Sequence, residues 1–259
     1  RDWSSDVCSS DLSQKNIPFI SVKVTGIARF ALLEKLDQAM SNPVGTLMQR
    51  YQQALQALSP EEMKEWQRVV GRLERIGQRA HAQRVGVFID AEDSWIQDPV
   101  DMATMLLMKQ HNQQQVVIYN TYQLYRHDRL SFLKECCEAA IEHHFILGAK
   151  LVRGAYMEKE RQRASELNYP SPIQKDKEHT DRDFNAAIAY CIDHLDVISL
   201  VVASHNEYSQ VLTARLMEEK KIARDHKHIH FSQLYGMSDH ITFNLAKEGY
   251  RVSKYLPFG

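Results

Sequence analysis

Seven short apolar runs recur along the chain, and a polar or charged residue closes or follows each of them. The runs are Phe19–Val24, Val87–Ile89, Val116–Tyr119, Phe145–Val152, Val197–Ala203, His228–Phe231 and Tyr250–Tyr255. Amphipathic helical stretches separate nearly all of them, and this alternation predicts an α/β fold with parallel strands. Parallel barrels carry their chemistry on polar residues at the carboxyl ends of the strands. Because a closed (βα)8 TIM-type barrel needs eight strands, the seven runs predict an incomplete barrel.

The connection between the first two runs is unusually long and helical, which predicts a helical insertion at about residues 42–84 rather than a separate domain. A helix is expected over Ile27–Met40, and another begins at Ser59, an N-cap residue that Pro60 and Glu62 complete as a capping box. Apolar residues at helical spacing then form a core-facing stripe, made of Met63, Trp66, Val69, Val70, Leu73 and Ile76.

The remaining helices are predicted from the same spacing. They cover Met102–Gln110, Leu130–His144, the later part of Arg153–Leu167, His179–Leu195, Glu207–Lys220 and Asp239–Lys247. For the first of these, Asp98 followed by Pro99 predicts an N-cap with proline at the first helical position.

Composition narrows the class of protein. The chain has 259 residues, 44% of them hydrophobic and 25% charged, and a net charge of −1 that gives no general attraction to nucleic acid or membranes. No apolar run approaches the roughly 18–20 residues of a membrane-spanning helix, and no signal peptide is recognisable. Four cysteines without a C-x-x-C motif predict a reduced, cytoplasmic environment.

The ends of the chain look foreign or cut. Residues 1–12 have no apolar period, and Asp6–Leu12 resembles a translated sequencing adapter, so we predict that this segment is not native and that the partial barrel covers residues 13–259. The abrupt end at Pro257-Phe258-Gly259 suggests truncation there as well.

Several polar residues at the predicted strand ends could carry chemistry. Asp90 and Glu92 follow the second run and, as residues i and i+2, would share a strand face. One reading makes them a helix-start cap or a solvated loop. The other places Asp90 at the barrel mouth beside Lys23 and Lys150.

The segment 148–156 is the densest concentration of candidate residues. Lys150 and Arg153 are cations suited to an anionic ligand, and Gly154 permits close backbone approach or a positive φ. No G-x-G-x-x-G or P-loop pattern is present, which argues against a Rossmann-type nucleotide site. Gln123 could contact a heterocycle edge and His205 could stack on a ligand, although either could equally be structural.

Histidines at 226, 228 and 230 raise the question of a metal site. A solvated loop entering a strand accounts for them more simply, so no metal is predicted.

Taken together, these blocks resemble the proline dehydrogenase family, and most closely its mitochondrial-type branch, which also has a helical insertion before the aspartate strand. The resemblance runs in unbroken order from about Ile17 to Gly259. The blocks are Ser21-Val22-Lys23, Ile89-Asp90-Ala91-Glu92, Asn120-Thr121-Tyr122-Gln123, Ala149-Lys150-Leu151-Val152-Arg153-Gly154-Ala155-Tyr156, Ala203-Ser204-His205-Asn206, Gln233-Leu234-Tyr235-Gly236-Met237 and Lys254-Tyr255-Leu256-Pro257-Phe258-Gly259.

The resemblance implies a (βα)8 barrel that binds FAD and oxidises L-proline to Δ1-pyrroline-5-carboxylate, the first step of proline catabolism, with a quinone as electron acceptor. It also leaves open a peripheral association with the inner membrane. By position, Asp90 and Lys150 match active-site residues, and Lys23 and Tyr255 match residues of the proline pocket. Residues that match FAD contacts are Ala91, Gln123, Lys150, Arg153, Gly154, Ala155, Ser204 and His205.

The chain also departs from the family pattern. The strand expected before the Lys23 strand is absent, as is the last helix, whose paired arginines would hold the substrate carboxylate. Lys150 stands where some members have arginine, and lysine cannot form a bidentate pair. We therefore expect weak proline binding by this chain.

Two other functions remain open from the sequence. A metal-dependent barrel hydrolase could use Asp90, Glu92 and His205, although Lys150 would repel a cation there. A non-catalytic barrel is the second alternative, because a fold alone does not establish a function.

Overall fold

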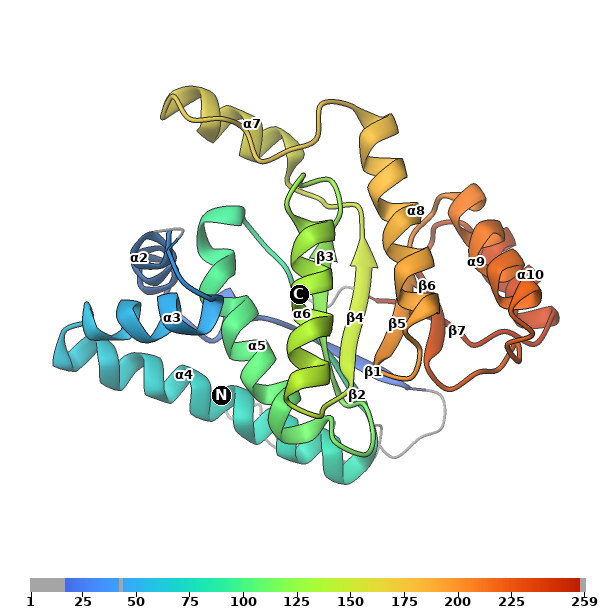
Figure 1. Ribbon diagram of the computed structural model, residues 1–259, viewed down its shortest axis with the longest axis horizontal. Helices are drawn as coiled ribbons and strands as arrows, with labels where there is room; N and C mark the ends of the chain where they lie inside the picture. Colours follow the sequence, from blue (N-terminus) through green and yellow to red (C-terminus); the bar gives the residue numbers. More distant parts are fainter. Residues whose placement is uncertain (1–16, 42–43, 257–259) are drawn as a thin grey trace. The chain divides into compact units, whose positions relative to one another are not determined.

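The computed structural model describes residues 17–41 and 44–256 (Figure 1). Contacts divide the chain after Asn120 into two compact units, which are described separately. The predicted segment 1–12 and the chain end at 257–259 lie outside the described residues.

Unit 1 contains the first strands and the helical insertion. In chain order its elements are β1 (Phe19–Lys23), the 3-10 turn η1 (Val24–Gly26), α2 (Phe30–Met40), α3 (Leu47–Gln56), α4 (Pro60–Gln83), β2 (Gly86–Asp90), the 3-10 turn η2 (Ser94–Ile96), α5 (Gln97–His111) and the first part of β3 (Ile118–Gln123). Strands β1, β2 and β3 pair in parallel in that order.

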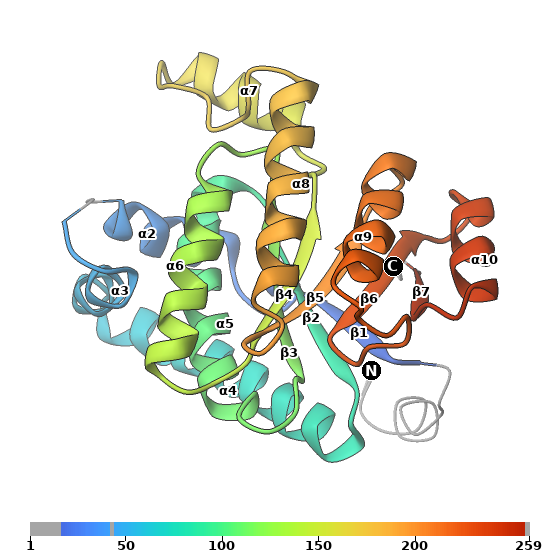
Figure 2. The ribbon, with the colours of Figure 1, turned by 45° about the vertical axis from the view of Figure 1, so that its right-hand side comes forward.

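Unit 2 repeats strand and helix in turn. After the end of β3 come α6 (Arg129–Glu142), β4 (Leu147–Val152), α7 (Met157–Glu166), α8 (Lys177–Asp193), β5 (Ile198–Ala203), α9 (Glu207–Glu219), β6 (Ile229–Leu234), α10 (Asp239–Lys247) and β7 (Val252–Tyr255). Strands β4 to β7 pair in parallel in chain order, and α8 lies beside α9 (Figure 2).

All seven predicted runs form strands, so the predicted count of seven is confirmed for the described residues. Strands β4 and β5 are buried along almost their whole length, as expected for parallel strands covered on both faces. The third strand begins at Ile118 rather than Val116. It ends at Gln123, so this residue is part of the strand.

The capping motif of the insertion is confirmed. Ser59 accepts a hydrogen bond from the Glu62 amide at 3.2 Å, and the Glu62 carboxylate accepts one from the Ser59 amide at 2.8 Å. Trp66 on α4 is fully buried and donates from Nε1 to the Tyr51 hydroxyl of α3 at 2.7 Å, which joins the two helices of the insertion. The predicted helix over Ile27–Met40 is shorter than expected, because η1 delays its start to Phe30.

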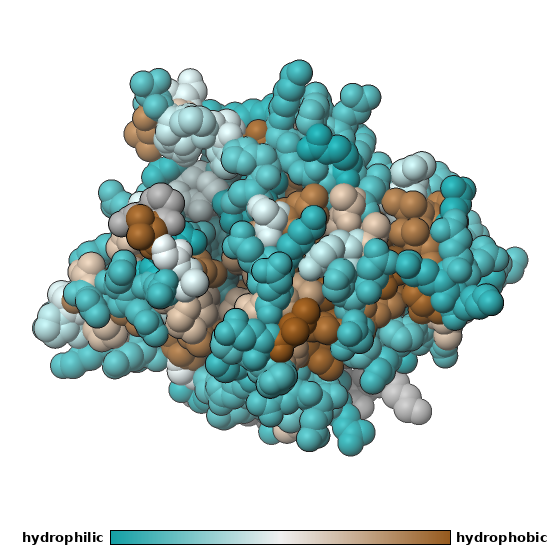
Figure 3. Space-filling view, in the orientation of Figure 1, coloured by the Kyte–Doolittle hydropathy of each residue, from teal (hydrophilic) through white to brown (hydrophobic). Residues whose placement is uncertain are grey.

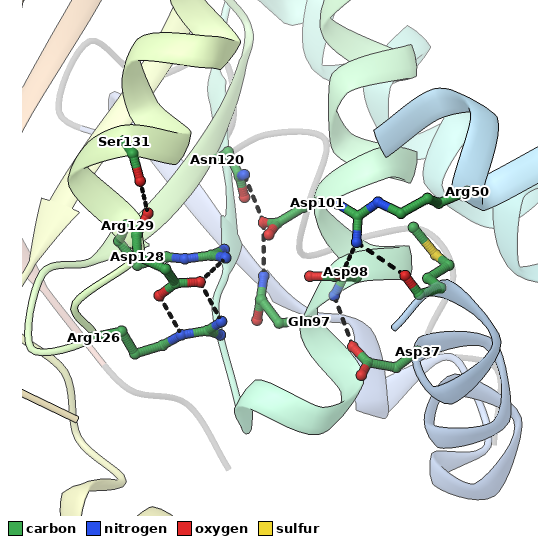
Figure 4. A network of polar contacts seen from close by, with 11 residues as sticks. Asp37, Arg50, Gln97, Asp98, Asp101, Asn120, Arg126, Asp128, Arg129 and Ser131 are labelled. Atoms are coloured by element: carbon green, nitrogen blue, oxygen red, sulfur yellow. Dashed lines mark hydrogen bonds and ion pairs between the residues drawn. The ribbon is translucent and has the colours of Figure 1, made fainter. Parts of the chain in front are cut away.

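The predicted N-cap at Asp98 is wrong. Helix α5 starts at Gln97 after η2, so Asp98 lies within its first turn. The Asp98 carboxylate instead accepts from Arg50 Nη1 of α3 at 3.3 Å, and the Asp98 amide donates to Asp37 of α2 at 3.0 Å (Figure 4). Tertiary partners from distant helices therefore replace the local cap.

Candidate active site

The unit 1 candidates lie at the carboxyl ends of β1 and β2. Asp90 closes β2, is buried, and accepts a hydrogen bond from the Ser21 hydroxyl at 2.7 Å. Lys23 is the register partner of Asp90 on β1 and is exposed. The prediction that these two residues are neighbours at strand ends is confirmed, because register partners on parallel strands stand side by side.

Glu92 has a different role from Asp90. Strand β2 ends at Asp90, so the prediction that the two carboxylates share a strand face is wrong. The Glu92 carboxylate receives both donors of Thr25, from the amide at 3.2 Å and from the hydroxyl at 2.6 Å. This pair of hydrogen bonds, called the Thr25–Glu92 clasp below, joins the segment after β1 to the segment after β2.

A buried amide and carboxylate network holds the segment after β2, and Figure 4 shows its members Gln97, Asp101 and Asn120. The Glu92 amide donates to Gln97 Oε1 at 3.0 Å, and Gln97 Nε2 donates to Asp101 Oδ1 at 2.9 Å. Asn120 Nδ2 of β3 donates to the same oxygen at 2.8 Å, and each of these three network side chains is at most 1% exposed. The sequence reasoning missed this network, and only the i, i+4 spacing of Gln97 and Asp101 could have suggested it.

In unit 2, Lys150 is a buried cation on β4. Its Nζ lies 4.7 Å from the centre of the Tyr255 ring of β7, which places two predicted site residues in direct cation–π contact. Gln123 is also buried, at the end of β3, as its predicted place at a strand end requires.

Arg153 lies just beyond β4 and connects four elements. Its guanidinium donates to Asp181 of α8 at 2.7 Å, to the Ser204 hydroxyl at 2.6 Å and to the Ser209 hydroxyl of α9 at 3.0 Å. The guanidinium carbon also lies 4.2 Å from the centre of the Phe184 ring. Arg153 is therefore held in one orientation before any ligand arrives.

Gly154 has the positive φ that the sequence suggested, at 135°. A Cβ at this position would meet the Tyr125 ring at 2.5 Å, so only glycine permits this approach of the backbone to the ring. Ala155 follows it and is exposed. The backbone here is held against the segment that follows β3, because the Tyr125 amide donates to the Arg153 carbonyl at 2.8 Å.

Ser204 and His205 follow β5. The Ser204 carbonyl accepts from Gln210 Nε2 at 2.7 Å, and its hydroxyl accepts from the Asn206 amide at 3.0 Å. His205 is exposed, and partial burial together with the nearby Lys254 ammonium lowers the pKa of its imidazole. His205 is therefore neutral at pH 7 and able to stack or donate without carrying charge.

Two arginines after β3 bind the same carboxylate (Figure 4). The sequence did not predict this arrangement. Arg126 and Arg129 both bond Asp128, at 2.8 Å and 2.5 Å. Burial would raise the pKa of the Asp128 carboxyl, but the two guanidinium groups outweigh it and hold that pKa well below the usual range. This ion-paired turn shapes the loop beyond Gln123.

Metal ligation finds no support in the described part of the chain, where no group of three or more His, Cys, Asp or Glu is arranged to hold an ion. The three cysteines of unit 2 are buried, and burial raises the pKa of the Cys137 and Cys191 thiols, which makes them poor metal ligands and nucleophiles. In residues 17–41 and 44–256 no helix has the length and apolarity to cross a membrane.

The site residues thus fall into two groups. Lys23, Asp90 and Ala91 belong to unit 1, whereas Gln123, Lys150, Arg153, Gly154, Ala155, Ser204, His205 and Tyr255 belong to unit 2. The expectation that residues 23, 90, 123, 150 and 205 surround one cavity joins the two units and stays a prediction.

Parallel strands whose carboxyl ends present buried ionisable side chains, with helices between them, define an α/β protein of the TIM-barrel type. The proline utilization A (PutA) protein of Bdellovibrio bacteriovorus has the same fold, with a TM-score of 0.76 at 20% identity over 94% of this chain and 23% of that one. A family model described as proline dehydrogenase matches residues 3–259, and the chain belongs to that family.

Curated relatives agree with this assignment. Hydroxyproline dehydrogenase of Xenopus laevis is 34% identical over 93% of this chain and 55% of its own length. Proline dehydrogenase 1, mitochondrial, of Dictyostelium discoideum is 32% identical over 93% of this chain and 47% of its own length. The carbapenem antibiotics biosynthesis protein CarD of Pectobacterium carotovorum is 33% identical over 96% of this chain and 60% of its own length. The chain thus spans about half the length of the curated relatives it matches.

Proposed function

We propose that the protein is an FAD-dependent proline dehydrogenase that oxidises L-proline to Δ1-pyrroline-5-carboxylate. The observation that carries this proposal is the buried Lys150 cation in contact with the Tyr255 ring at the strand ends of a chain of this family. A buried cation costs desolvation free energy, which is recovered where an anionic ligand is bound.

The unit 2 residues fit the expected cofactor. Two cations, Lys150 and Arg153, and the Ser204 hydroxyl lie beyond or near the ends of β4 and β5, a donor set suited to an anionic, phosphate-bearing ligand. Arg153 is already oriented by Asp181, Ser204 and Ser209. We assign Gln123, Lys150, Arg153, Gly154, Ala155, Ser204 and His205, with Ala91 of unit 1, to FAD binding.

The chemistry that FAD supplies when bound is the acceptance of a hydride from the substrate. The substrate carbon gives up that hydride, its nitrogen gives up a proton, and a C=N bond forms. The amine must be neutral before the hydride leaves, so the pocket must favour the uncharged amine. We assign Lys23 and Asp90 to the electrostatics of that pocket, and Lys150 to stabilising negative charge near the hydride acceptor.

Tyr255 is assigned to the wall of the substrate pocket. Its ring is held beside Lys150, and its carbonyl accepts from the Tyr235 amide at 2.8 Å, so the residue is fixed by both its backbone and its side chain. A fixed ring face beside a cation suits a small amino acid, whose aliphatic ring can pack against it.

We further propose a quinone as electron acceptor and a peripheral attachment of the protein to a membrane. Two relatives of this chain are described as mitochondrial proline dehydrogenases, and a lipid-soluble acceptor would be reached at a membrane surface. A hydroxyproline dehydrogenase among the relatives makes hydroxyproline the competing substrate.

The test is spectroscopic. The purified protein should absorb near 450 nm, as oxidised flavins generally do. L-proline should bleach this band without oxygen, at the high concentrations that the expected weak binding of proline requires. Hydroxyproline should be compared at the same concentrations. A protein that binds FAD but is bleached by neither substrate would contradict the proposed reaction, whereas one that takes up no FAD at all would contradict the assigned cofactor.

A further inference from the structure

Helix α4, the long helix of the insertion (Figure 1), carries a stripe of exposed basic residues. Its members, all exposed, are Lys64, Arg68, Arg72, Arg75 and Arg79. At about 100° of rotation and 1.5 Å of rise per residue, the five positions lie within an arc of about 80° and span roughly 22 Å. The insertion therefore presents a line of five cations, and Glu61, at the N-terminal end of the helix, is the one α4 glutamate within the same arc.

The net charge of −1 conceals this local excess. Residues 44–84 contain seven Lys and Arg against four Asp and Glu, a net charge of +3. Three of those four glutamates are engaged elsewhere. Glu62 pairs with Lys35 and Glu65 with Arg29, both from the segment around α2, while Glu74 accepts from side chains that include Gln110 of α5.

The stripe keeps a positive charge, although Arg68, after Arg29, also helps to lower the pKa of the Glu65 carboxyl. Within residues 17–41 and 44–256, no carboxylate forms an ion pair with any of its five cations. Arg72 donates to the Ile27 carbonyl at 3.0 Å. This hydrogen bond fixes the Arg72 side chain against the segment after β1, and its charge is not cancelled. A shallow groove follows the stripe and is lined by Lys64, Gln67, Arg68, Gly71, Arg72 and Arg75.

We infer that the basic stripe of α4 docks on a surface of anionic phospholipid headgroups. Arginine forms paired hydrogen bonds with phosphate, and each basic side chain near an anionic bilayer adds favourable binding free energy. Gly71 leaves the groove open between the arginines, since an added Cβ would meet nothing closer than Arg75 Nη1 at 4.0 Å.

Two observations favour lipid phosphates over nucleic acid. Single-stranded nucleic acid is bound through aromatic side chains on which bases stack, yet Trp66, the one Phe, Tyr or Trp residue of α4, is buried and bonded to Tyr51. Outside the insertion the remaining chain carries a net charge of −4, which would repel a long polyanion that wraps the protein, whereas a planar bilayer meets one face alone.

The proposed attachment is electrostatic, and no side chain of α4 needs to enter the hydrocarbon core of the bilayer. The exposed large hydrophobic residues of the described chain include none from α4, and the space-filling view shows a mostly hydrophilic surface over this helix (Figure 3). Binding should therefore weaken as salt rises, because surface charges are screened beyond about 8 Å at physiological ionic strength. This inference gives the proposed membrane attachment a defined surface and rests on that part of the proposed function alone.

The experiment is vesicle co-sedimentation of the purified protein, without proline or any electron acceptor. Vesicles of phosphatidylcholine containing one third phosphatidylglycerol should bind the protein at low salt, and pure phosphatidylcholine vesicles should not. The variant R68Q/R75Q/R79Q should lower the partition coefficient about 100-fold. A matched control, R215Q/K227Q/K247Q, removes the same charge from exposed positions of unit 2 and should leave binding unchanged.

The outcomes separate the proposals. Equal binding to neutral vesicles, equal loss in the control variant, or no decline with salt would each overturn the docking surface. Binding of an RNA oligonucleotide that the α4 variant loses, without vesicle binding, would assign the stripe to nucleic acid instead. Far-ultraviolet circular dichroism checks that both variants fold, and the salt titration of the unaltered protein tests the inference even where a variant does not. Because no turnover is measured, failure here leaves the proposed oxidation untouched.

Discussion

The ammonium nitrogen of Lys150 lies 4.7 Å from the centre of the Tyr255 ring, although the two residues stand on β4 and β7 and are far apart in the chain. Contact between a buried cation and a ring face is favourable by up to about 2 kcal/mol when water is excluded. The pair therefore fixes the position of a charge that the proposed reaction needs.

Replacing Lys150 tests that charge. Lys150→Met should slow the bleaching of bound flavin by L-proline about 100-fold, because a positioned charge near the hydride acceptor contributes about 3 kcal/mol to the transition state. Lys150→Arg keeps the charge and serves as the control. Anaerobic stopped-flow absorbance near 450 nm measures both, and equal rates in the Met variant and the unaltered protein would remove Lys150 from the mechanism.

The strand pattern of this chain was predictable because it is local. Each apolar run overlaps one strand of the structure, and the polar residue at its end needs no distant partner to be recognised. The start of α4 was predictable for the same reason, since a capping box involves residues only three positions apart.

Features that depend on distant partners were not predictable. Asp98 looks like a cap from its neighbours, but Arg50 and Asp37 of other helices bind it instead. The i, i+4 spacing of Gln97 and Asp101 could suggest their own contact, but nothing local indicates that Asn120 of β3 joins them in a buried network. The basic stripe is different, because the three- and four-residue spacing of its members on one helix is local and only the total charge of the chain concealed it.

Arg153 should resist even conservative replacement. Lysine keeps the charge but cannot reach Asp181, Ser204 and Ser209 together, so Arg153→Lys should lower the free energy of unfolding by about 1–3 kcal/mol. The variant should also retain less FAD after gel filtration. The control is Arg182→Lys, an arginine with a 63% exposed side chain whose ion pair with Asp183 contributes little. Urea unfolding of both variants makes the comparison, and similar losses in the two would contradict a special role for Arg153.

The clasp between Thr25 and Glu92 is expected to be structural. Thr25→Val removes the hydroxyl that donates to Glu92 at 2.6 Å and should lower stability by about 1–2 kcal/mol. Glu92→Gln should have a similar effect, and the double variant should lose less than the sum because both changes break one interaction. Asp90→Asn, by contrast, should impair flavin reduction with little change in stability. If Thr25→Val slowed reduction as strongly as Asp90→Asn at unchanged stability, Glu92 would have to be counted among the catalytic groups.

His230 should make the protein sensitive to mild acid. Burial, and to a smaller extent the nearby Arg251 guanidinium, lower the pKa of its imidazole to about 4. Since the folded state binds this proton less readily than the unfolded state, whose histidine has a pKa near 6.5, the stabilisation is present above pH 6.5 and is lost as the pH falls toward 4. The linkage predicts a loss of about 2 kcal/mol between pH 7 and pH 5 from this residue.

A neutral replacement isolates the contribution of His230. His230→Gln should flatten the decline in unfolding free energy between pH 7 and pH 5, whereas His240→Gln, at an exposed position of α10, should leave the decline as it is. Part of the decline should persist in His230→Gln, because burial also lowers the pKa of His228 to about 4. Urea titrations at several pH values measure these slopes. Identical slopes in the His230 variant and the unaltered protein would mean that this imidazole is not kept neutral by the fold.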